Sequence, residues 1–248
     1  MRFGLCAANI SSYADPRNVV RLAETAEATG WEALLLWDHL AWVWNGASAD
    51  PWTALAAAGA RTERLIVGTA VTPVPRRRPH VLANQLATLD ELTGGGRVVL
   101  GAGLGGVERE FTNFGENADP KHRARLLDEG LERINELLAG PLGPREIPIW
   151  IGGNSGAARR RAVRYGGWLP DTADLESMKV SPEQLETWLR ETGPMDSPWN
   201  VGVTGYSQPA ETDLFDSYEL AGASWWFETI HDRRATFTEL LERIEAGP

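Results

Sequence analysis

Short apolar runs alternate with amphipathic stretches along the whole chain, and this alternation constrains the fold more than any other feature. The apolar runs predict strands at 2–7, 33–37, 65–70, 97–101, 147–151, 168–169, 200–204 and 224–227. The amphipathic stretches predict helices at 16–29, 51–61, 79–92, 121–138, 155–165, 182–191, 211–220 and 233–246. Such alternation implies a parallel sheet, and eight units in 248 residues favour a closed (β/α)8 barrel, the TIM-barrel fold, over an open doubly wound sheet.

The bulk composition limits the class of protein. Since no linker or low-complexity stretch divides the chain, residues 1–248 are expected to form one α/β domain. The net charge of −10 argues against general binding to nucleic acids or to anionic membranes. The one cysteine, Cys6, excludes an internal disulfide framework and a cysteine-rich metal site, and we expect no metal. Neither a signal peptide nor a spanning segment is recognisable, so a cytoplasmic location is expected.

The second predicted strand ends in Asp38 and His39. In a (β/α)8 barrel the functional groups lie where strands end and lead into the following helices. Histidine titrates near neutral pH and a carboxylate favours its protonated form, so the pair is a candidate acid–base unit. The alternative is that Asp38 caps a turn and His39 packs against it. The other histidines, His80, His122 and His231, lie at or near predicted helix starts, where we expect capping or solvent exposure.

The third predicted strand ends in small residues up to Ala70, and Val71 and Thr72 follow. Small residues at strand ends allow a flat ligand to approach the backbone. The loop then carries the arginine triplet 76–78, a basic rim that suits phosphate or carboxylate groups. The alternative is a solvated run of charge before a helix.

The fourth predicted strand ends in a glycine-rich run with Gly101, Gly103 and Gly105. This run superficially matches a dinucleotide-binding fingerprint, but it lies in mid-chain and no helical pattern begins directly after it. Room for a planar ring is the more consistent interpretation. Glu108 and Glu110 follow, and either could be a general acid or a surface carboxylate.

The fifth predicted strand ends in Gly152, Gly153 and Asn154, and a helix follows. Free N–H groups at a helix N-terminus, together with the helix dipole, suit a phosphate, although the glycines could serve the turn alone. In the last predicted strand, Trp225 and Trp226 are adjacent and must point to opposite faces. One is therefore expected to point into the barrel or its mouth.

Six segments in this order resemble the luciferase-like flavin-dependent oxidoreductases. The segments are Asp38-His39, 68–73, 100–105, Glu110-Phe111, 148–153 and 222–226. The resemblance implies a TIM barrel that uses FMN or the deazaflavin coenzyme F420. It places the cofactor ring over the end of the third strand, backed by a bulge with a cis peptide at Ala70-Val71. It also implies that the cofactor phosphate lies at 152–154 and that His39 acts as a base or contacts the substrate.

The sequence departs from the family pattern in two places. The chain is shorter than many relatives, and the sixth strand reads Gly166-Gly167-Trp168 where relatives often carry an acidic residue before the glycine. The contribution of this strand to phosphate binding is therefore in question.

Three functions stay open at the level of sequence. An arginine rim at Arg76 and Arg77 would help to hold the oligoglutamate tail of F420, which favours F420 over FMN and implies hydride transfer to or from a small organic substrate. His39 would then move the proton, and Trp42 and Trp44 would wall the substrate pocket. With FMN, the family implies an O₂-using monooxygenase fed by a separate reductase.

The third function is a non-redox hydrolase or lyase, which would use Asp38 and Glu108 as a carboxylate pair, or a cofactor-binding protein without turnover. Because many relatives are dimers, a homodimer is also compatible with the resemblance.

Overall fold

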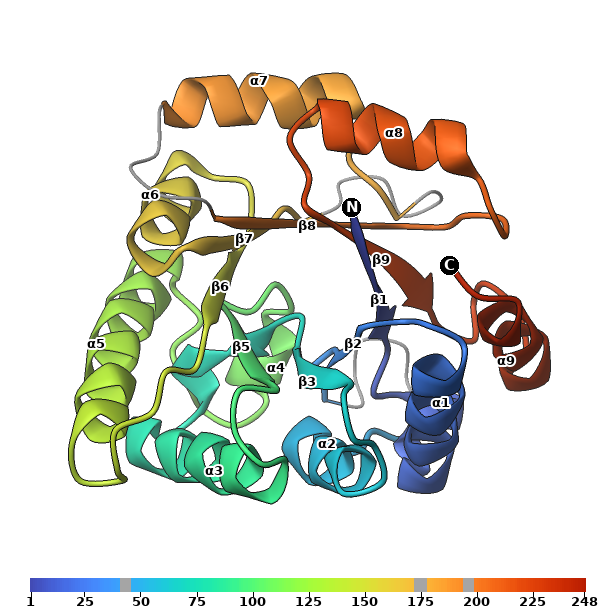
Figure 1. Cartoon of the computed structure of the whole chain (residues 1–248). Coiled ribbons are helices and arrows are strands. Elements are labelled where there is room, and N and C mark those ends of the chain that lie inside the picture. The colour runs from blue at the N-terminus through green and yellow to red at the C-terminus, as the bar shows by residue number, and fades with distance from the viewer. Residues whose placement is uncertain (41–45, 172–177, 194–198) are drawn as a thin grey trace.

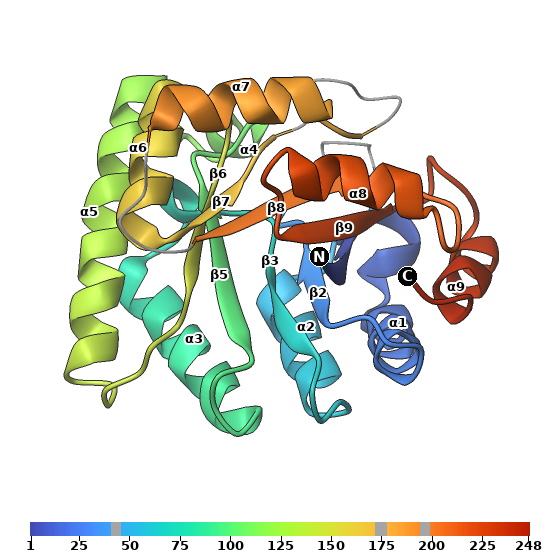
Figure 2. The same cartoon turned by 45° about the horizontal axis from the view of Figure 1, so that its top comes forward.

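The computed structural model describes residues 1–40, 46–171, 178–193 and 199–248, and its parallel strands close into a barrel. Helices surround the strands, as Figure 1 shows along the barrel and Figure 2 shows from a tilted view. The strands are β1 (Arg2–Ala7), β2 (Ala33–Leu36), β3 (Ile66–Thr69), β4 (Thr72–Pro73), β5 (Val98–Gly103), β6 (Ile149–Gly152), β7 (Gly167–Leu169), β8 (Asn200–Gly205) and β9 (Trp225–Ile230). The pairing of β3 with β5 closes the ring, so the predicted (β/α)8 barrel is confirmed.

The helices follow the strands as the sequence predicts, with one short addition. They are α1 (Pro16–Ala28), α2 (Pro51–Gly59), α3 (Pro79–Leu92), α4 (Arg109–Thr112), α5 (Pro120–Ala139), α6 (Gly156–Tyr165), α7 (Pro182–Thr192), α8 (Thr212–Leu220) and α9 (Phe237–Glu245). Two 3₁₀ turns, Ser11–Ala14 and Val74–Arg76, lie in loops. Among the described residues, no helix combines the length and apolar character needed to cross a membrane.

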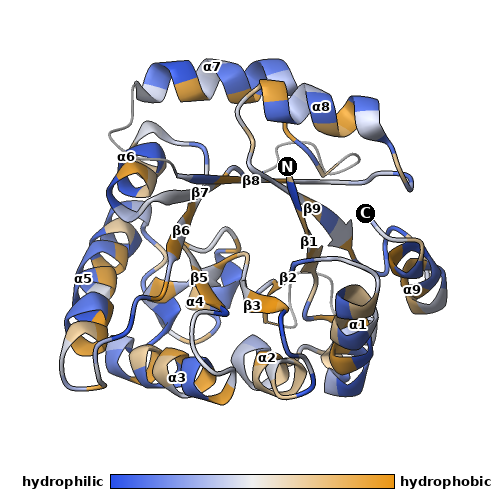
Figure 3. Ribbon diagram, viewed as in Figure 1, coloured by the Kyte–Doolittle hydropathy of each residue, from blue (hydrophilic) through white to orange (hydrophobic). Residues whose placement is uncertain are grey.

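Local sequence fixes where most of these helices begin. Asp15, Asp50 and Asp119 each precede a proline, and each accepts a hydrogen bond from a backbone N–H of the first turn. An N-terminal side-chain acceptor and a proline at the first helical position both favour a helix start. The outer helices are amphipathic, and Figure 3 shows hydrophilic and hydrophobic residues interspersed along α1, α5 and α9.

The barrel interior is filled by side chains and forms its own small core. Large rings fill it, with Trp225 stacked on Phe227 at a centroid distance of 5.4 Å and Trp150 beside both. A Cβ atom at Gly4 or Gly202 would lie within 2.5 to 2.7 Å of the Phe227 ring, so only glycine fits at these positions. Trp226 instead packs outward, so the expected opposite orientation of the two tryptophans is confirmed.

Strand β9 is longer than predicted, and this moves one histidine. The predicted strand ended at Phe227, but β9 continues to Ile230. His231 was expected to cap a helix or to face solvent. That prediction is wrong, because His231 is buried at the carboxyl end of β9 and α9 begins only at Phe237. The unpredicted elements α4 and β4 both lie on loops at this carboxyl-end rim.

Candidate functional site

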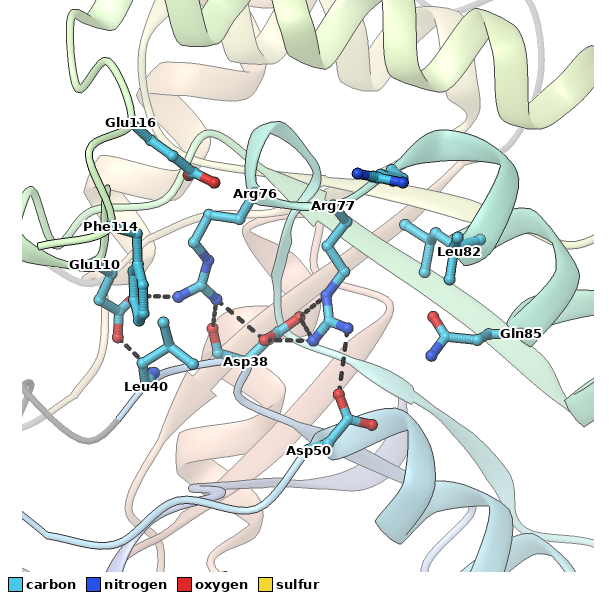
Figure 4. Close-up of a pocket in the computed structure, with 12 residues that line it drawn as sticks. Asp38, Leu40, Asp50, Arg76, Arg77, Leu82, Gln85, Glu110, Phe114 and Glu116 are labelled. Atoms are coloured by element: carbon cyan, nitrogen blue, oxygen red, sulfur yellow. Dashed lines mark hydrogen bonds and ion pairs between the residues drawn. The ribbon is translucent and has the colours of Figure 1, made fainter. Parts of the chain in front are cut away.

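Charged side chains from three separate loops meet on one side of the barrel mouth. Arg76 donates through Nη1 to Glu110 Oε2 at 2.7 Å and through Nη2 to Asp38 Oδ1 at 3.0 Å, and it also donates to the Asp38 carbonyl. Arg77 Nη2 lies 2.7 Å from the other Asp38 oxygen and Nη1 lies 3.2 Å from Asp50. Figure 4 shows the two guanidinium groups between the carboxylates. We call Asp38, His39, Arg76, Arg77 and Glu110 the charged cluster.

Glu110 links this cluster to His39. Its Oε1 lies 3.1 Å from His39 Nδ1 and accepts the Leu40 N–H at 2.6 Å, while Oε2 accepts from Arg76. The Glu110 side chain is 1% exposed and the His39 side chain 26% exposed. A carboxylate on Nδ1 fixes the orientation of the imidazole and leaves Nε2 to exchange a proton. The charged cluster thus presents one accessible titratable ring on a rigid support.

The arginines of this cluster are not a free basic rim. The Arg76 side chain is 7% exposed and contacts two carboxylates. Burial alone would lower the pKa of Arg77, but the charges of Asp38 and Asp50 raise it. The role of Arg76 and Arg77 in holding a cofactor therefore stays a prediction, while their pairing with carboxylates is observed. Arg78, the third of the triplet, is exposed.

The bulge expected after the third strand is present. The Ala70-Val71 peptide is cis, which confirms the expectation. A Cβ atom at Gly103 would lie 2.6 Å from Val71 Cγ2, and one at Gly152 would lie 2.8 Å from Val71 Cγ1. At Gly101 a Cβ would meet the Thr69 carbonyl oxygen at 1.8 Å. These glycines make room for the bulge itself.

Gly105 and Thr72, two further residues expected to contact the cofactor, have structural contacts. Gly105 has a φ of +85°, and a Cβ there would lie 2.9 Å from the Phe111 ring of α4, so this glycine allows α4 to bring Glu110 inward. Thr72 is buried and donates to the Thr69 hydroxyl at 3.1 Å. Glu108, the alternative acid, is exposed at the start of α4, so of the two glutamates only Glu110 joins the charged cluster.

The loop before α6 has partners of its own. The Gly153 N–H donates to Leu169, and the Asn154 side chain pairs with the backbone of Asp171 in both directions, at 2.6 and 2.8 Å. These bonds fix the loop. Ser155 Oγ accepts the Ala158 N–H at 3.1 Å, and the N–H groups of Gly156 and Ala157 point out of the helix end. The exposed Arg160 lies beside that end, since its Nη1 would be 3.4 Å from a Cβ at Gly156. Donors and a cation for a phosphate are thus present here.

A second set of polar side chains lies at the barrel mouth, and the sequence did not predict it. Tyr206 follows β8, and its hydroxyl lies 2.8 Å from Nε2 of His231. Burial, and secondarily the charge of Arg234, lowers the pKa of His231 to about 4, so the ring is neutral near pH 7. We call Tyr206 and His231 the neutral pair. The strand alternation that starts at Trp225 could have revealed it, had the strand been extended to its true end.

Trp37 separates the neutral pair from the charged cluster. Its ring centroid lies 5.9 Å from that of His39 and 5.7 Å from that of His231, and its indole N–H donates to Cys6 Sγ at 3.2 Å. Burial raises the pKa of the Cys6 thiol to about 12, so Cys6 is a neutral interior group. Trp42 and Trp44, expected to wall the substrate pocket, lie outside the described residues.

A cavity of about 440 Å³ opens beside the charged cluster. Its lining includes Arg78, Leu82, Gln85 and the half-exposed Phe114. Figure 4 shows Asp38 and Arg77 among the side chains that line it. Within the described ranges, no group of three or more His, Cys, Asp or Glu side chains is arranged to hold a metal ion.

Sequence comparisons point to one family. Residues 1–214 match the family model described as luciferase-like monooxygenase. An F420-dependent glucose-6-phosphate dehydrogenase of Microbacterium testaceum is 37% identical over 187 residues, which are 66% of this chain and 54% of the relative. The 4-hydroxyprotoasukamycin monooxygenase of Streptomyces nodosus is 31% identical over 148 residues, 60% of this chain and 39% of the relative. The chain spans about half the length of the curated dehydrogenases that it matches first.

Solved structures share the fold at low identity. An F420-dependent secondary alcohol dehydrogenase in complex with an F420–acetone adduct superposes with a TM-score of 0.74 at 17% identity, over 100% of this chain and 99% of the other. The monooxygenase RslO1 from Streptomyces bottropensis gives 0.74 at 19% identity, over 99% and 97%.

Proposed function

This chain belongs to the luciferase-like monooxygenase family, and on that premise we propose that it is an F420-dependent oxidoreductase that transfers a hydride to or from a small organic substrate. The observation that carries the proposal is the charged cluster, in which Glu110 holds Nδ1 of the partly exposed His39 at the barrel mouth. Oxidation of an alcohol carbon releases a proton with the hydride, so it needs a base of this kind. The curated F420-dependent relatives favour the deazaflavin over FMN.

The residues present fit such a cofactor. The α6 N-terminus and Arg160 would hold a phosphate, and Gly153, with a φ of +109°, keeps a side chain away from that loop. The Val71 bulge would lie beneath the ring. When bound, the deazaflavin supplies the acceptor or donor of the hydride. Because Arg76 and Arg77 pair with carboxylates, the preference for F420 rests on the curated relatives and not on a free arginine rim.

Three residues of the charged cluster then have separate roles. His39 takes up or returns the substrate proton at Nε2, and Glu110 stabilises the imidazolium that forms. Arg76 holds the Glu110 carboxylate in place through the ion pair at 2.7 Å. Glu110 is thus the orienting group, and His39 is the group that exchanges the proton.

The monooxygenase alternative keeps one specific support, the monooxygenase among the curated relatives. It requires FMN and a separate reductase. The hydrolase alternative would need Asp38 and Glu108 together, whereas Asp38 is bound by two arginines and Glu108 is exposed. The proposal includes a soluble cytoplasmic homodimer.

Titration of the purified protein with F420 and with FMN, each followed by fluorescence, tests the cofactor. We expect saturable binding of F420 and at least about tenfold weaker binding of FMN, a difference of ~1.4 kcal/mol. Tighter binding of FMN would favour the monooxygenase alternative. Failure of both ligands to bind would overturn the proposed function.

A further inference from the structure

One buried side chain, Asn9, binds both backbone polar groups of His39. Asn9 follows β1 and is fully buried. Its Nδ2 donates to the His39 carbonyl and to the Ala49 carbonyl, each at 2.8 Å, and its Oδ1 accepts the His39 N–H at 3.1 Å. Because the amide nitrogen meets two carbonyls and the amide oxygen meets an N–H, the orientation of this side chain is fixed.

Bonds to side chains take the place of a strand ladder around His39. β2 ends at Leu36, so His39 lies beyond the strand. Side chains bind both polar groups of each of the two peptides that flank His39. Arg76 donates to the Asp38 carbonyl, Asn9 binds the His39 N–H and carbonyl, and Glu110 accepts the Leu40 N–H. The backbone position of His39 therefore depends on side chains that come from other loops.

The segment that carries Asn9 is itself anchored. The Ala49 N–H donates to the Asn9 carbonyl at 2.9 Å, and the neighbouring residues Ile10 and Ser48 form an antiparallel β-bridge. Asn9 thus joins the end of β1 to two points of the β2–α2 connection, one at His39 and one at Ala49. A side chain that is fixed in this way can in turn fix the group that it binds.

Asn9 and Glu110 hold different parts of His39. Glu110 Oε1 lies 3.1 Å from Nδ1 and orients the ring, whereas Asn9 binds the backbone from which the ring projects. A displacement of a catalytic group by about 1 Å can lower the rate roughly 10²-fold. Loss of the Asn9 bonds is therefore expected to affect the reaction through His39.

We propose that Asn9 is a positioning residue, which holds the backbone of His39 so that Nε2 reaches the substrate proton at the barrel mouth. Asn9 lies outside the charged cluster and acts through His39, because its buried amide bonds to the backbone. The effect on turnover rests on the proposed function, whereas the hold of Asn9 on His39 is independent of it.

The first test follows the His39 ring by NMR, without cofactor or substrate. The chain has four histidines, so selective ¹³C labelling of histidine gives few ring signals, and His39→Ala assigns the one from His39. We expect this signal to move and broaden in Asn9→Ala, because the ring then samples more than one position. Asn18→Ala is the matched control, since the Asn18 amide also donates to a backbone carbonyl, that of Ser12, and should leave the signal in place. An unmoved signal in Asn9→Ala overturns the proposal.

The second test measures turnover of the F420-loaded protein with propan-2-ol and cyclohexanol, followed by the loss of F420 absorbance. In Asn9→Ala we expect kcat to fall about 10–10²-fold, while KM and the F420 dissociation constant stay within about threefold. Combined with His39→Ala, Asn9→Ala should cause no further loss, since both changes act on one group. An equal fall of turnover with and without His39 would show a general structural role and overturn the proposal.

A second variant decides the matter if Asn9→Ala does not fold. Asn9→Ser keeps a hydroxyl, which has one donor where the amide has two, so the His39 signal should still move. A folded Asn9→Ser with the wild-type His39 signal overturns the proposal. If the signal moves as expected but neither alcohol reduces F420 in the wild-type protein, the hold of Asn9 on His39 stands and the proposed function fails.

Discussion

The two polar sides of the barrel mouth differ in how they satisfy buried groups. On the β2 and β3 side, the charged cluster balances Asp38 and Glu110 against two arginines. On the β8 and β9 side, the neutral pair makes one hydrogen bond between uncharged groups. A buried ion pair that loses one partner leaves an uncompensated charge, while a neutral pair loses only a hydrogen bond. The comparison indicates that the charged side depends on several ion pairs for its geometry, whereas the neutral side does not.

Removing Arg76 is the most direct way to break this contrast. Arg76→Met leaves the buried Asp38 and Glu110 without a shared cation, so the free energy of unfolding should fall by about 3–5 kcal/mol. Denaturant unfolding measures the loss. The exposed Arg78→Met is the control and should stay within about 0.5 kcal/mol of wild type. A stability equal to wild type in Arg76→Met would mean that the cluster is not held by these ion pairs.

Replacing Glu110 tests whether this side chain orients His39 for turnover. Glu110→Gln keeps the size of the side chain but replaces one acceptor by a donor, which mismatches Arg76, the Leu40 N–H or His39. We expect turnover to fall by roughly a hundredfold, while the F420 affinity stays within about threefold. Glu108→Gln, two residues away and exposed, should leave both quantities near wild type. If the two variants behave alike, Glu110 has no special role.

A third change tests the expected phosphate site at the N-terminus of α6, which lies outside both the charged cluster and the neutral pair. Gly153→Val should weaken F420 binding by at least about tenfold, ~1.4 kcal/mol, because the side chain would project beside the α6 N-terminus. Gly143 also has a positive φ, +84° against +109° at Gly153, and lies in the α5–β6 connection at the other end of the barrel, so Gly143→Val controls for backbone strain. An equal loss of F420 affinity in Gly153→Val and Gly143→Val would contradict a phosphate site in the loop before α6.

The effect of the neutral pair should appear only in the pH dependence of stability. The pKa of His231 is about 4 in the folded protein and 6.5 in the reference state, so between these values the unfolded chain binds the extra proton. The contribution of His231 to stability is therefore complete above about pH 6.5 and is lost as the pH falls toward 4. His231→Gln should flatten the pH slope of the free energy of unfolding by up to ~1.4 kcal/mol per pH unit in that window. Identical slopes in the two proteins would show that His231 is not buried as a neutral ring.

Much of this architecture could be predicted from the sequence because the alternation of strands and helices is a local signal. The barrel, the bulge at Ala70-Val71 and the opposite faces of Trp225 and Trp226 all follow from local pattern or family resemblance, and all are confirmed. The placement of Asp38 and His39 at a strand end follows in the same way.

The rest depended on contacts between distant segments. Glu228 reads as the end of a strand because it is charged, yet Arg234 and Ser207 allow it to be buried, and β9 continues. The arginines after the third strand read as a solvent-facing rim, yet the carboxylate partners of Arg76 and Arg77 lie 27 to 39 residues away in the sequence. Composition alone does not reveal such pairs, so the burial of His231 and the pairing of Arg76 and Arg77 with carboxylates were not predicted.

The central claim is that His39 exchanges the substrate proton and that the cofactor binds without it. The measurement that tests it compares turnover and the F420 dissociation constant in wild type and His39→Ala, with the exposed His80→Ala as control. We predict that turnover of the alcohol that the wild-type protein oxidises falls by about 10²–10⁴-fold in His39→Ala, while the dissociation constant changes less than about threefold. Unchanged turnover, or an equal loss of binding and turnover, would contradict the account.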